Sequence, residues 1–388
     1  MHLPRFRVRD TPGTGRCKGR PLALREMATQ TRGEAKLSRS RSVVALRVRE
    51  HTEELEKANL AEYATRSADA HRDRPEEPSP TRAAFALDRD RIVHSKAFRR
   101  LKHKTQVFLA PVGDHYRTRL THTLEVTQIG RSMARGLRLN EDLVEAMAMG
   151  HDVGHTPFGH VGEDLLGKFL PDGFRHNEQS VRIVEKIEKN GAGLNVTREV
   201  RDGILKHSAP TEGGVETTAW GVPETPEGWV VRYADKIAYL HHDIDDAMRA
   251  EIVREEDIPQ DIRASLGRDR AERLDTMIYD VIVTSYGKPV VTMSDEVLDA
   301  TNALRKFMFE NVYLAGPAKT EDRKAQGVLW ELLQHFEKNP ELLPPEHQRI
   351  GQRDGAKRAV ADYVAGMTDR YALDTYASIF IPSGWSHL

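Results

Sequence analysis

The chain reads MGHDVGHTPFGHVGE over residues 149–163, and this stretch indicates both the fold and the site. It holds three histidines and two carboxylates, with His151 directly beside Asp152 and His160 three residues before Glu163. Imidazole suits transition metals and carboxylate suits hard cations, so the mixed set suits a divalent ion that also holds phosphate and water. Because burying so many ionisable groups without a metal or a polyanion is costly, the stretch predicts a metal and phosphate site.

Two flanking segments have the apolar spacing of amphipathic helices. In residues 120–137, His122 shares one face with Val126 and with the apolar residues that follow at helical spacing. In residues 141–150 the apolar stripe continues into His151, which ends the segment just before an aspartate. Both segments are predicted to be helices that deliver a histidine to a buried position.

A third segment, residues 230–248, contributes a carboxylate. Tyr239 and Asp243 follow Asp235 at steps of four residues, and each such step turns only ~40° around a helix. The three side chains therefore share one face. Three helices are thus expected to bring two histidines and two aspartates together, with coordination positions left for water and substrate.

Composition limits the class of protein. The 388 residues have a net charge of −1, so the whole molecule has no general attraction to nucleic acid or membrane. Residues 1–40 are Arg-rich and lack apolar periodicity, which predicts a disordered basic arm and only superficially resembles a transit peptide. The single Cys17 excludes an intramolecular disulfide and favours a reducing compartment. Since no stretch suits a bilayer, a cytoplasmic location is expected.

The rest of the chain is predicted to be all-α. Residues 43–66 and most of the sequence after residue 84 have helical patterns, with a surface loop or hairpin at residues 211–228 and a short strand at residues 290–292. Residues 41–388 are expected to form one domain. Its metal core would span about residues 84–250, and a C-terminal helical lobe about residues 251–388.

The positions of His122, His151-Asp152 and Asp235 resemble the H…HD…D pattern of the HD-domain phosphohydrolases. More narrowly, RDRIVHSKAFRRL (residues 89–101), residues 149–163 and DYVAGMTDRYA (residues 362–372) are similar to the deoxynucleoside triphosphate triphosphohydrolases, the dGTPase-like proteins. The resemblance covers roughly residues 80–375. It implies an HD-domain helical core with additional C-terminal helices and at most a short hairpin of strand.

The resemblance implies a reaction and a metal. Water would attack the α-phosphorus of a dNTP, dGTP among them, and release deoxynucleoside and inorganic triphosphate. One divalent ion per site would be held by His122, His151, Asp152 and Asp235; Mn²⁺ and Mg²⁺ are expected first, with Fe, Co, Ni and Zn as alternatives. Such an ion polarises a phosphoryl oxygen and activates water.

The leaving 5′-oxygen needs a proton, and histidine is the natural donor because its pKa lies near working pH. His160 is the first candidate, with Glu163 three residues later able to orient it. His176 is the second, with Glu178 in support.

The remaining site residues divide between the two ends of the substrate. Arg119 lies three residues before His122 on the same helical turn, and its guanidinium suits phosphate oxygens. By resemblance, phosphate contacts are also expected from His155 and Lys236. Nucleoside contacts are expected from Gln106, Val107, Tyr239 and Asp243.

The expected partners follow from the same resemblance. They are a dNTP substrate, an activating dNTP at a second site and other copies of the chain in a homo-oligomer, from dimer to hexamer. Weak binding of single-stranded nucleic acid is an expectation from the basic arm, and no membrane partner is expected. Two other functions fit the residues: another HD-type phosphohydrolase, such as a 5′-nucleotidase or phosphodiesterase, and a nucleotide-sensing or nucleic-acid-binding regulator.

Overall fold

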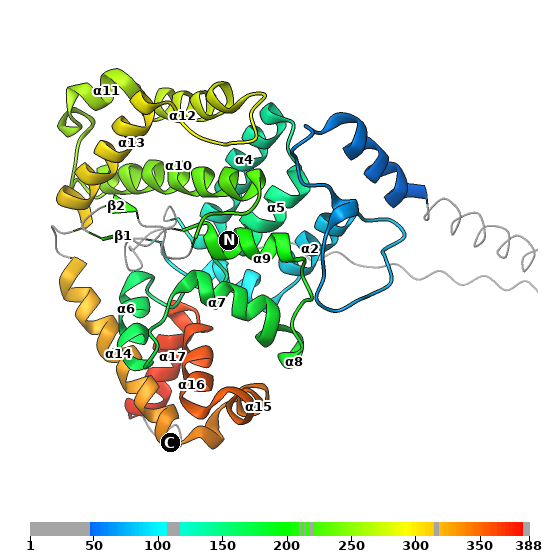
Figure 1. Ribbon diagram of the computed structural model, residues 1–388. Coiled ribbons are helices and arrows are strands. Elements are labelled where there is room, and N and C mark those ends of the chain that lie inside the picture. Colours follow the sequence, from blue (N-terminus) through cyan, green and yellow to red (C-terminus); the bar gives the residue numbers. More distant parts are fainter. Residues whose placement is uncertain are drawn as a thin grey trace, which may run out of the picture.

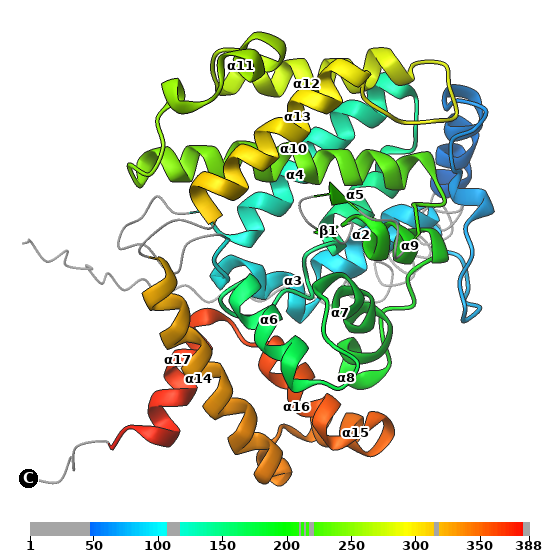
Figure 2. The same ribbon diagram turned by 60° about the vertical axis from the view of Figure 1, so that its left-hand side comes forward.

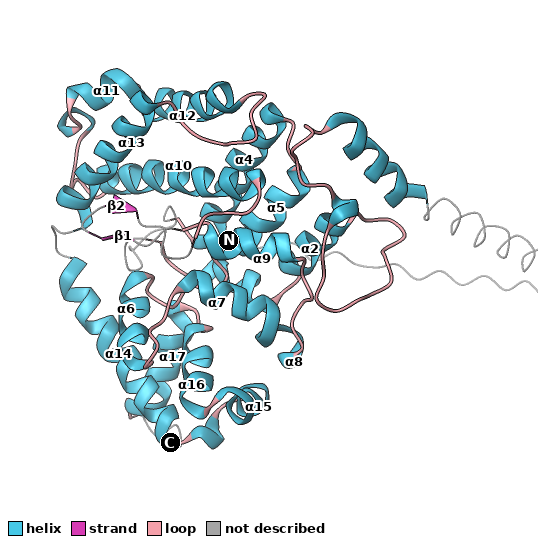
Figure 3. Cartoon of the chain, viewed as in Figure 1, coloured by secondary structure: helices cyan, strands magenta, loops and turns pink. Residues whose placement is uncertain are grey.

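The protein is almost entirely helical (Figures 1 and 3). The structure is a computed structural model that describes residues 47–106, 117–208, 211–212, 215–216, 221–313 and 318–382. The predicted basic arm, residues 1–40, lies outside these residues. Within them, the only strands are β1 (Thr211–Glu212) and β2 (Val215–Glu216), which pair as an antiparallel hairpin. The all-α class and its short hairpin are therefore confirmed.

Three helices form the centre of the larger apolar core. Helix α4 (Arg119–Leu137) packs against both α5 (Glu141–Gly150) and α10 (Pro226–Arg249). Each begins at a residue whose side chain accepts from the first turn: Thr118, Asn140 and Thr225. The predicted helices over residues 120–137, 141–150 and 230–248 are confirmed, and the apolar faces that predicted them are the faces that pack.

Further helices surround this centre. They are α2 (Ala84–Val93), α3 (Lys96–Arg100), α9 (Arg198–Lys206), α11 (Gln260–Leu266), α12 (Arg270–Ser285) and α13 (Asp295–Met308), with 3₁₀ turns at Ser67–Asp69, Leu101–His103 and Glu255–Asp257. A helix over residues 47–59 and a π-helical turn, Phe309–Tyr313, precede and follow them in the chain. Buried side chains of α12 and α13, such as Met277 and Leu304, belong to the same core as those of α4 and α10.

A second apolar core holds the C-terminal lobe. Helices α14 (Ala318–Lys338), α15 (Pro345–Asp354), α16 (Ala356–Ala365) and α17 (Asp369–Phe380) pack with α6 (His160–Phe169), which lies far earlier in the chain (Figure 2). Helices α7 (His176–Arg182) and α8 (Glu188–Gly191), with a π-helical turn between them, lie near this lobe and α9. Helices α11–α13 pack on the first core, whereas α14–α17 pack in the second core with α6. The predicted division into a metal core and a C-terminal lobe near residue 250 stays a prediction.

The predicted strand at residues 290–292 is wrong. Val290, Val291 and Thr292 run without helix or strand structure. The side chain of Ser285 bonds both the N–H and the carbonyl of Thr292, at 2.9 and 3.0 Å. A local side chain thus takes up the backbone groups that a neighbouring strand would have paired.

Candidate metal and phosphate site

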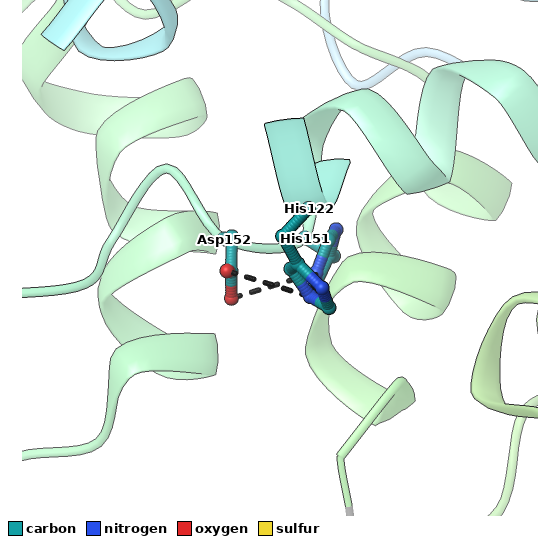
Figure 4. Close-up of side chains that lie close together, drawn as sticks. All are labelled: His122, His151 and Asp152. Atoms are coloured by element: carbon teal, nitrogen blue, oxygen red, sulfur yellow. Dashed lines mark hydrogen bonds and ion pairs between the residues drawn. The ribbon is translucent and has the colours of Figure 1, made fainter. Parts of the chain in front are cut away.

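The four predicted metal ligands meet at the centre of the first core. Helix α4 carries His122, the end of α5 leads into His151 and Asp152, and α10 carries Asp235. The Nε2 atoms of the two histidines lie 3.4 Å apart. Asp235 Oδ1 lies 3.1 Å from His122 Nε2 and 3.8 Å from His151 Nε2. Figure 4 shows His122 and His151 side by side, with the carboxylate of Asp152 facing them.

This set of donors fits a divalent metal. His151 Nδ1 lies 2.6 Å from the carbonyl oxygen of Ala148, so that nitrogen donates and the Nε2 lone pair points to the cluster. Asp152 lies 3.5 Å from His151 Nε2 and 3.9 Å from His122 Nε2. Ligands bound to one ion at about 2.1 Å are themselves roughly 3–3.5 Å apart, so small movements would let all four bind together.

The charges of the cluster also favour a cation. Burial would raise the pKa of Asp152, but His155, His151 and Arg119 outweigh burial and hold that pKa well below its usual value. Burial likewise opposes ionisation of Asp235, and hydrogen bonding to His122 holds the pKa of that aspartate low. The carboxylates of Asp152, which is buried, and Asp235, which is partly buried, are thus ionised beside the histidine nitrogens, which is the environment that a divalent ion needs.

Arg119 and His155 extend the site on one side of Asp152. Arg119 Nη1 donates to Asp152 Oδ2 at 2.9 Å, and His155 Nε2 lies 3.1 Å from Asp152 Oδ1. Both side chains are buried. Arg119 Nε and His155 Nδ1 are buried with no hydrogen-bond partner among the described residues. Buried polar atoms are normally paired, so these two indicate a place for an oxygen-rich ligand.

Glu163 links two histidines on the other side of His155. His176 Nδ1 lies 3.1 Å from Glu163 Oε1, and the backbone N–H of His176 donates to the same oxygen at 2.9 Å. His160 Nδ1 lies 3.5 Å from Glu163 Oε2, on a side chain that is 80% exposed. Both candidate proton donors therefore contact Glu163. Glu178, the predicted support of His176, is exposed, because a residue two positions later lies on the opposite side of the helix.

His207 completes this group and sequence reasoning missed it. Its Nδ1 lies 2.7 Å from the carbonyl oxygen of Ile204 and its Nε2 lies 3.3 Å from His176 Nε2. Burial and the neighbouring His151 lower the pKa of His207 to about 3, so it is neutral and its Nε2 accepts. The signal was present: His207 continues the apolar stripe of Val200 and Ile204.

The close packing of α7 against the metal ligands depends on a glycine. A Cβ atom added to Gly154 would lie 2.2 Å from the backbone nitrogen of Ser180 and 2.3 Å from the carbonyl oxygen of His176. The N–H of Gly154 donates to Ser180 Oγ, whose hydroxyl in turn donates to the carbonyl of His151. Glycine at this position thus lets α7 reach the loop that carries His151 and Asp152.

The remaining predicted substrate residues, phosphate-binding Lys236 and the nucleoside contacts, lie on α10 and beside α4. Lys236 and Asp243 are buried and Tyr239 is partly buried on α10, which also carries Asp235. Gln106 Oε1 is buried with no hydrogen-bond partner in the described part of the chain. Val107 lies outside the described residues. Lys236, Tyr239 and Asp243 thus share a helix with the predicted ligand Asp235, and their roles stay predictions.

Two residues that connect the site to the C-terminal lobe, Asp369 and Lys104, were also not predicted. Asp369, at the start of α17, accepts from the N–H and hydroxyl of Thr105 at 3.0 and 2.6 Å and from the N–H of Phe158 at 3.0 Å. The buried Lys104 donates to the carbonyls of His155 and Ala365. These bonds connect the loops carrying Gln106 and His155 to the C-terminal lobe.

Comparisons with known proteins identify the family of this chain. Residues 119–240 match the HD domain and residues 291–378 match the Phosphohydrolase-associated domain. A deoxyguanosinetriphosphate triphosphohydrolase-like protein of Caldanaerobacter subterraneus is 55% identical over 341 residues, which cover 88% of this chain and 98% of the relative. One of the same description from Clostridium perfringens is 49% identical, over 87% of this chain and 98% of the relative. A solved phosphohydrolase from Bacteroides thetaiotaomicron has a TM-score of 0.46 and 17% identity, over 74% of this chain and 69% of that one.

Proposed function

The chain belongs to the deoxyguanosinetriphosphate triphosphohydrolase-like proteins with an HD domain, and on this premise we propose that it hydrolyses dNTPs to deoxynucleoside and inorganic triphosphate. Membership supports a phosphohydrolase whose His and Asp cluster could hold a divalent metal. The substrate and the bond that is broken belong to the proposal. dGTP is among the expected substrates, and Mn²⁺ or Mg²⁺ is the expected ion.

The observation that carries the proposal is the set of buried, unpaired polar atoms beside the metal ligands. Arg119 Nε, His155 Nδ1 and Gln106 Oε1 have no hydrogen-bond partner among the described residues. Arg119 Nε donates and suits a phosphate oxygen, His155 Nδ1 suits one once the ring is protonated, and Gln106 Oε1 accepts and suits a hydroxyl donor on the sugar. A ligand with phosphates at one end and a sugar at the other satisfies all three. When bound, the metal supplies charge that stabilises the attacked phosphoryl group.

We assign the proton donor to His160. Water adds to the α-phosphorus, the bond from phosphorus to the 5′-oxygen breaks, and that oxygen takes a proton. Both ring nitrogens of His176 are engaged, one by Glu163 and the other by His207. Among the described residues His160 contacts Glu163 through Nδ1, which leaves its Nε2 to reach the leaving oxygen. His176, whose pKa Glu163 raises, supplies a positive charge beside the phosphates.

Product analysis tests the reaction. Each dNTP is incubated with the metal-free protein, alone and with Mn²⁺ or Mg²⁺, and the products are followed by phosphorus NMR. We expect triphosphate and deoxynucleoside only with metal, and loss of activity on chelation. Release of orthophosphate or pyrophosphate would instead assign another HD-type phosphohydrolase. Nucleotide binding without turnover, under all metals tried, would favour the sensing regulator.

The proposal extends to assembly and regulation. We propose a homo-oligomer and an activating dNTP at a second site, both on family membership alone. Light scattering with and without each dNTP, combined with assays of dNTP mixtures, tests these two statements. Binding of labelled single-stranded DNA, compared between the full chain and one lacking residues 1–40, tests nucleic-acid binding by the arm. No helix within the described residues has the length and apolar character needed to cross a bilayer.

A further inference from the structure

Behind the predicted ligand His122 lies a second buried histidine that the proposed reaction does not use. His242 is on α10, two turns after Asp235, and it is only 1% exposed. Its Nδ1 lies 3.3 Å from His122 Nδ1, and the two rings meet edge to face, 5.3 Å between centroids. The other nitrogen of His242, Nε2, contacts the carboxylate of Glu125. His242 thus bridges His122 and a carboxylate on the same helix as His122.

The hydrogen-bonding roles in this chain are fixed by the predicted metal. If His122 Nε2 binds the ion, its proton must be on Nδ1, which then donates to His242 Nδ1. A neutral His242 that accepts at Nδ1 carries its proton on Nε2, which donates to Glu125. One arrangement of protons satisfies all three groups.

Glu125 is the outer end of this chain and is itself held in place. Its side chain is 34% exposed, and its Oε1 lies 3.8 Å from Arg117 Nε. Arg117 also pairs with Asp245 and Asp246 of α10, at 2.8 and 3.1 Å. The ion pairs tie Glu125 and the C-terminal part of α10 to the start of α4.

We propose that His242 and Glu125 are positioning residues that orient His122 and raise its affinity for the metal. This inference rests on the metal centre of the proposed function, but it does not depend on which phosphate compound is hydrolysed. A metal-binding histidine is normally oriented by a partner at its other nitrogen, and removing such a partner typically weakens metal binding about 10–100-fold. Here the partner is an imidazole backed by a carboxylate.

The adjacent His241 provides a matched control. It is also buried on α10, but its Nδ1 lies 2.6 Å from the carbonyl oxygen of Ile237, within its own helix. His241→Leu removes a buried imidazole of the same size from the next position and leaves His122 untouched. Comparing it with His242→Leu separates orientation of the ligand from loss of a buried side chain.

Metal affinity is the measurement. Metal-free proteins are titrated with Mn²⁺ against a fluorescent chelator, and folding is checked by circular dichroism and melting temperature. We expect His242→Leu to bind Mn²⁺ about 10–100-fold more weakly and His241→Leu to bind within about twofold of wild type. His242→Gln should restore most of the affinity, because an amide can accept from His122 and donate to Glu125. Glu125→Gln should give an intermediate loss.

Several outcomes would overturn the inference. They are wild-type affinity in His242→Leu, an equal loss in His241→Leu, and no difference between Leu and Gln at position 242 at equal melting temperature. If His242→Leu does not fold, Glu125→Gln and His242→Gln are compared with wild type instead. Wild-type affinity for Mn²⁺ in Glu125→Gln would show that Glu125 does not help to orient His122. If the variants confirm that His242 and Glu125 orient His122 but the protein releases orthophosphate, this inference holds and the proposed reaction is wrong.

Discussion

His176, which is partly buried, pairs with the buried Glu163, one carboxylate oxygen of which accepts from both the ring and the backbone N–H of the histidine, at 3.1 and 2.9 Å. Because His207 accepts at its Nε2, the second ring nitrogen of His176 is also a donor. A histidine that donates from both nitrogens is an imidazolium. Burial opposes that charge, but Glu163 outweighs it and raises the pKa of His176 above 6.5.

The first prediction is a pH dependence set by this pair. A raised pKa means that the charge is fully present below the ordinary histidine pKa and is lost as pH rises through the higher, folded value. Turnover should therefore fall as pH rises through the folded pKa of His176. His176→Gln should lose on the order of a hundred-fold in rate and flatten that alkaline limb. The pH profile of kcat in both proteins checks this, and an unchanged alkaline limb in His176→Gln would contradict it.

The second prediction separates chemistry from metal binding. His160→Ala should keep its metal and its fold but lose on the order of a hundred- to ten-thousand-fold in turnover, as expected for a general acid. Asp152→Ala, the contrasting variant, should lose the metal as well as the activity. Metal content and kcat are measured on the same samples. Near-normal turnover of His160→Ala would move the proton donor to His176.

The third prediction concerns the sugar. Asp243 is buried on the helix that carries Asp235, so it should contact the nucleoside rather than the metal. Asp243→Ala should leave metal content unchanged and weaken the use of dNTPs about five- to hundred-fold, which corresponds to ~1–3 kcal/mol for an unpaired buried donor. Analogues without a 3′-hydroxyl should lose less. An equal loss with both kinds of substrate would show that Asp243 does not read that hydroxyl.

The fourth prediction concerns Asp369, which joins α17 to the loops of the site. Asp369→Ala leaves two backbone N–H groups without their acceptor, at a cost of about 1–3 kcal/mol each. The melting temperature should fall, and KM should rise more than kcat falls, because Gln106 follows Thr105 directly. Asp374→Ala, an exposed carboxylate on the same helix, is the control and should change neither. Equal KM values for the two variants would refute the link.

Periodicity explains which parts of the site were predictable. His122 and Asp235 lie on helices, and His151 directly follows one, whose apolar faces are visible in the sequence, so their approach to the core followed from local spacing. The partners of Glu163 were harder to predict from the sequence. His160 is three positions before Glu163, but His176 is thirteen positions after it. Helical spacing places Glu178 on the side of α7 that faces away from His176. His207 lies 31 positions after His176 and continues an apolar helical stripe, but nothing in the sequence indicates which residue it contacts.

Contacts between distant segments were beyond local patterns. Asp369 meets Thr105 across 264 residues, and Lys104 reaches Ala365 across 261. No spacing rule joins such positions. The strand expected at residues 290–292 failed for a related reason: β-branched residues favour extended backbone, but a strand needs a neighbour, and only tertiary structure supplies one.

The hydrogen bonds of Lys104 to His155 and Ala365 limit how this protein can be truncated or fused to another. Its amine is buried between the carbonyl of His155 and that of Ala365 at the end of α16, and burial together with Arg100 lowers its pKa to about 7. Cutting the chain before α14 would leave that amine and the amides of Thr105 and Phe158 facing an empty surface. The HD region is therefore not a detachable module, and a minimal catalyst would have to keep the lobe or be redesigned at those three positions.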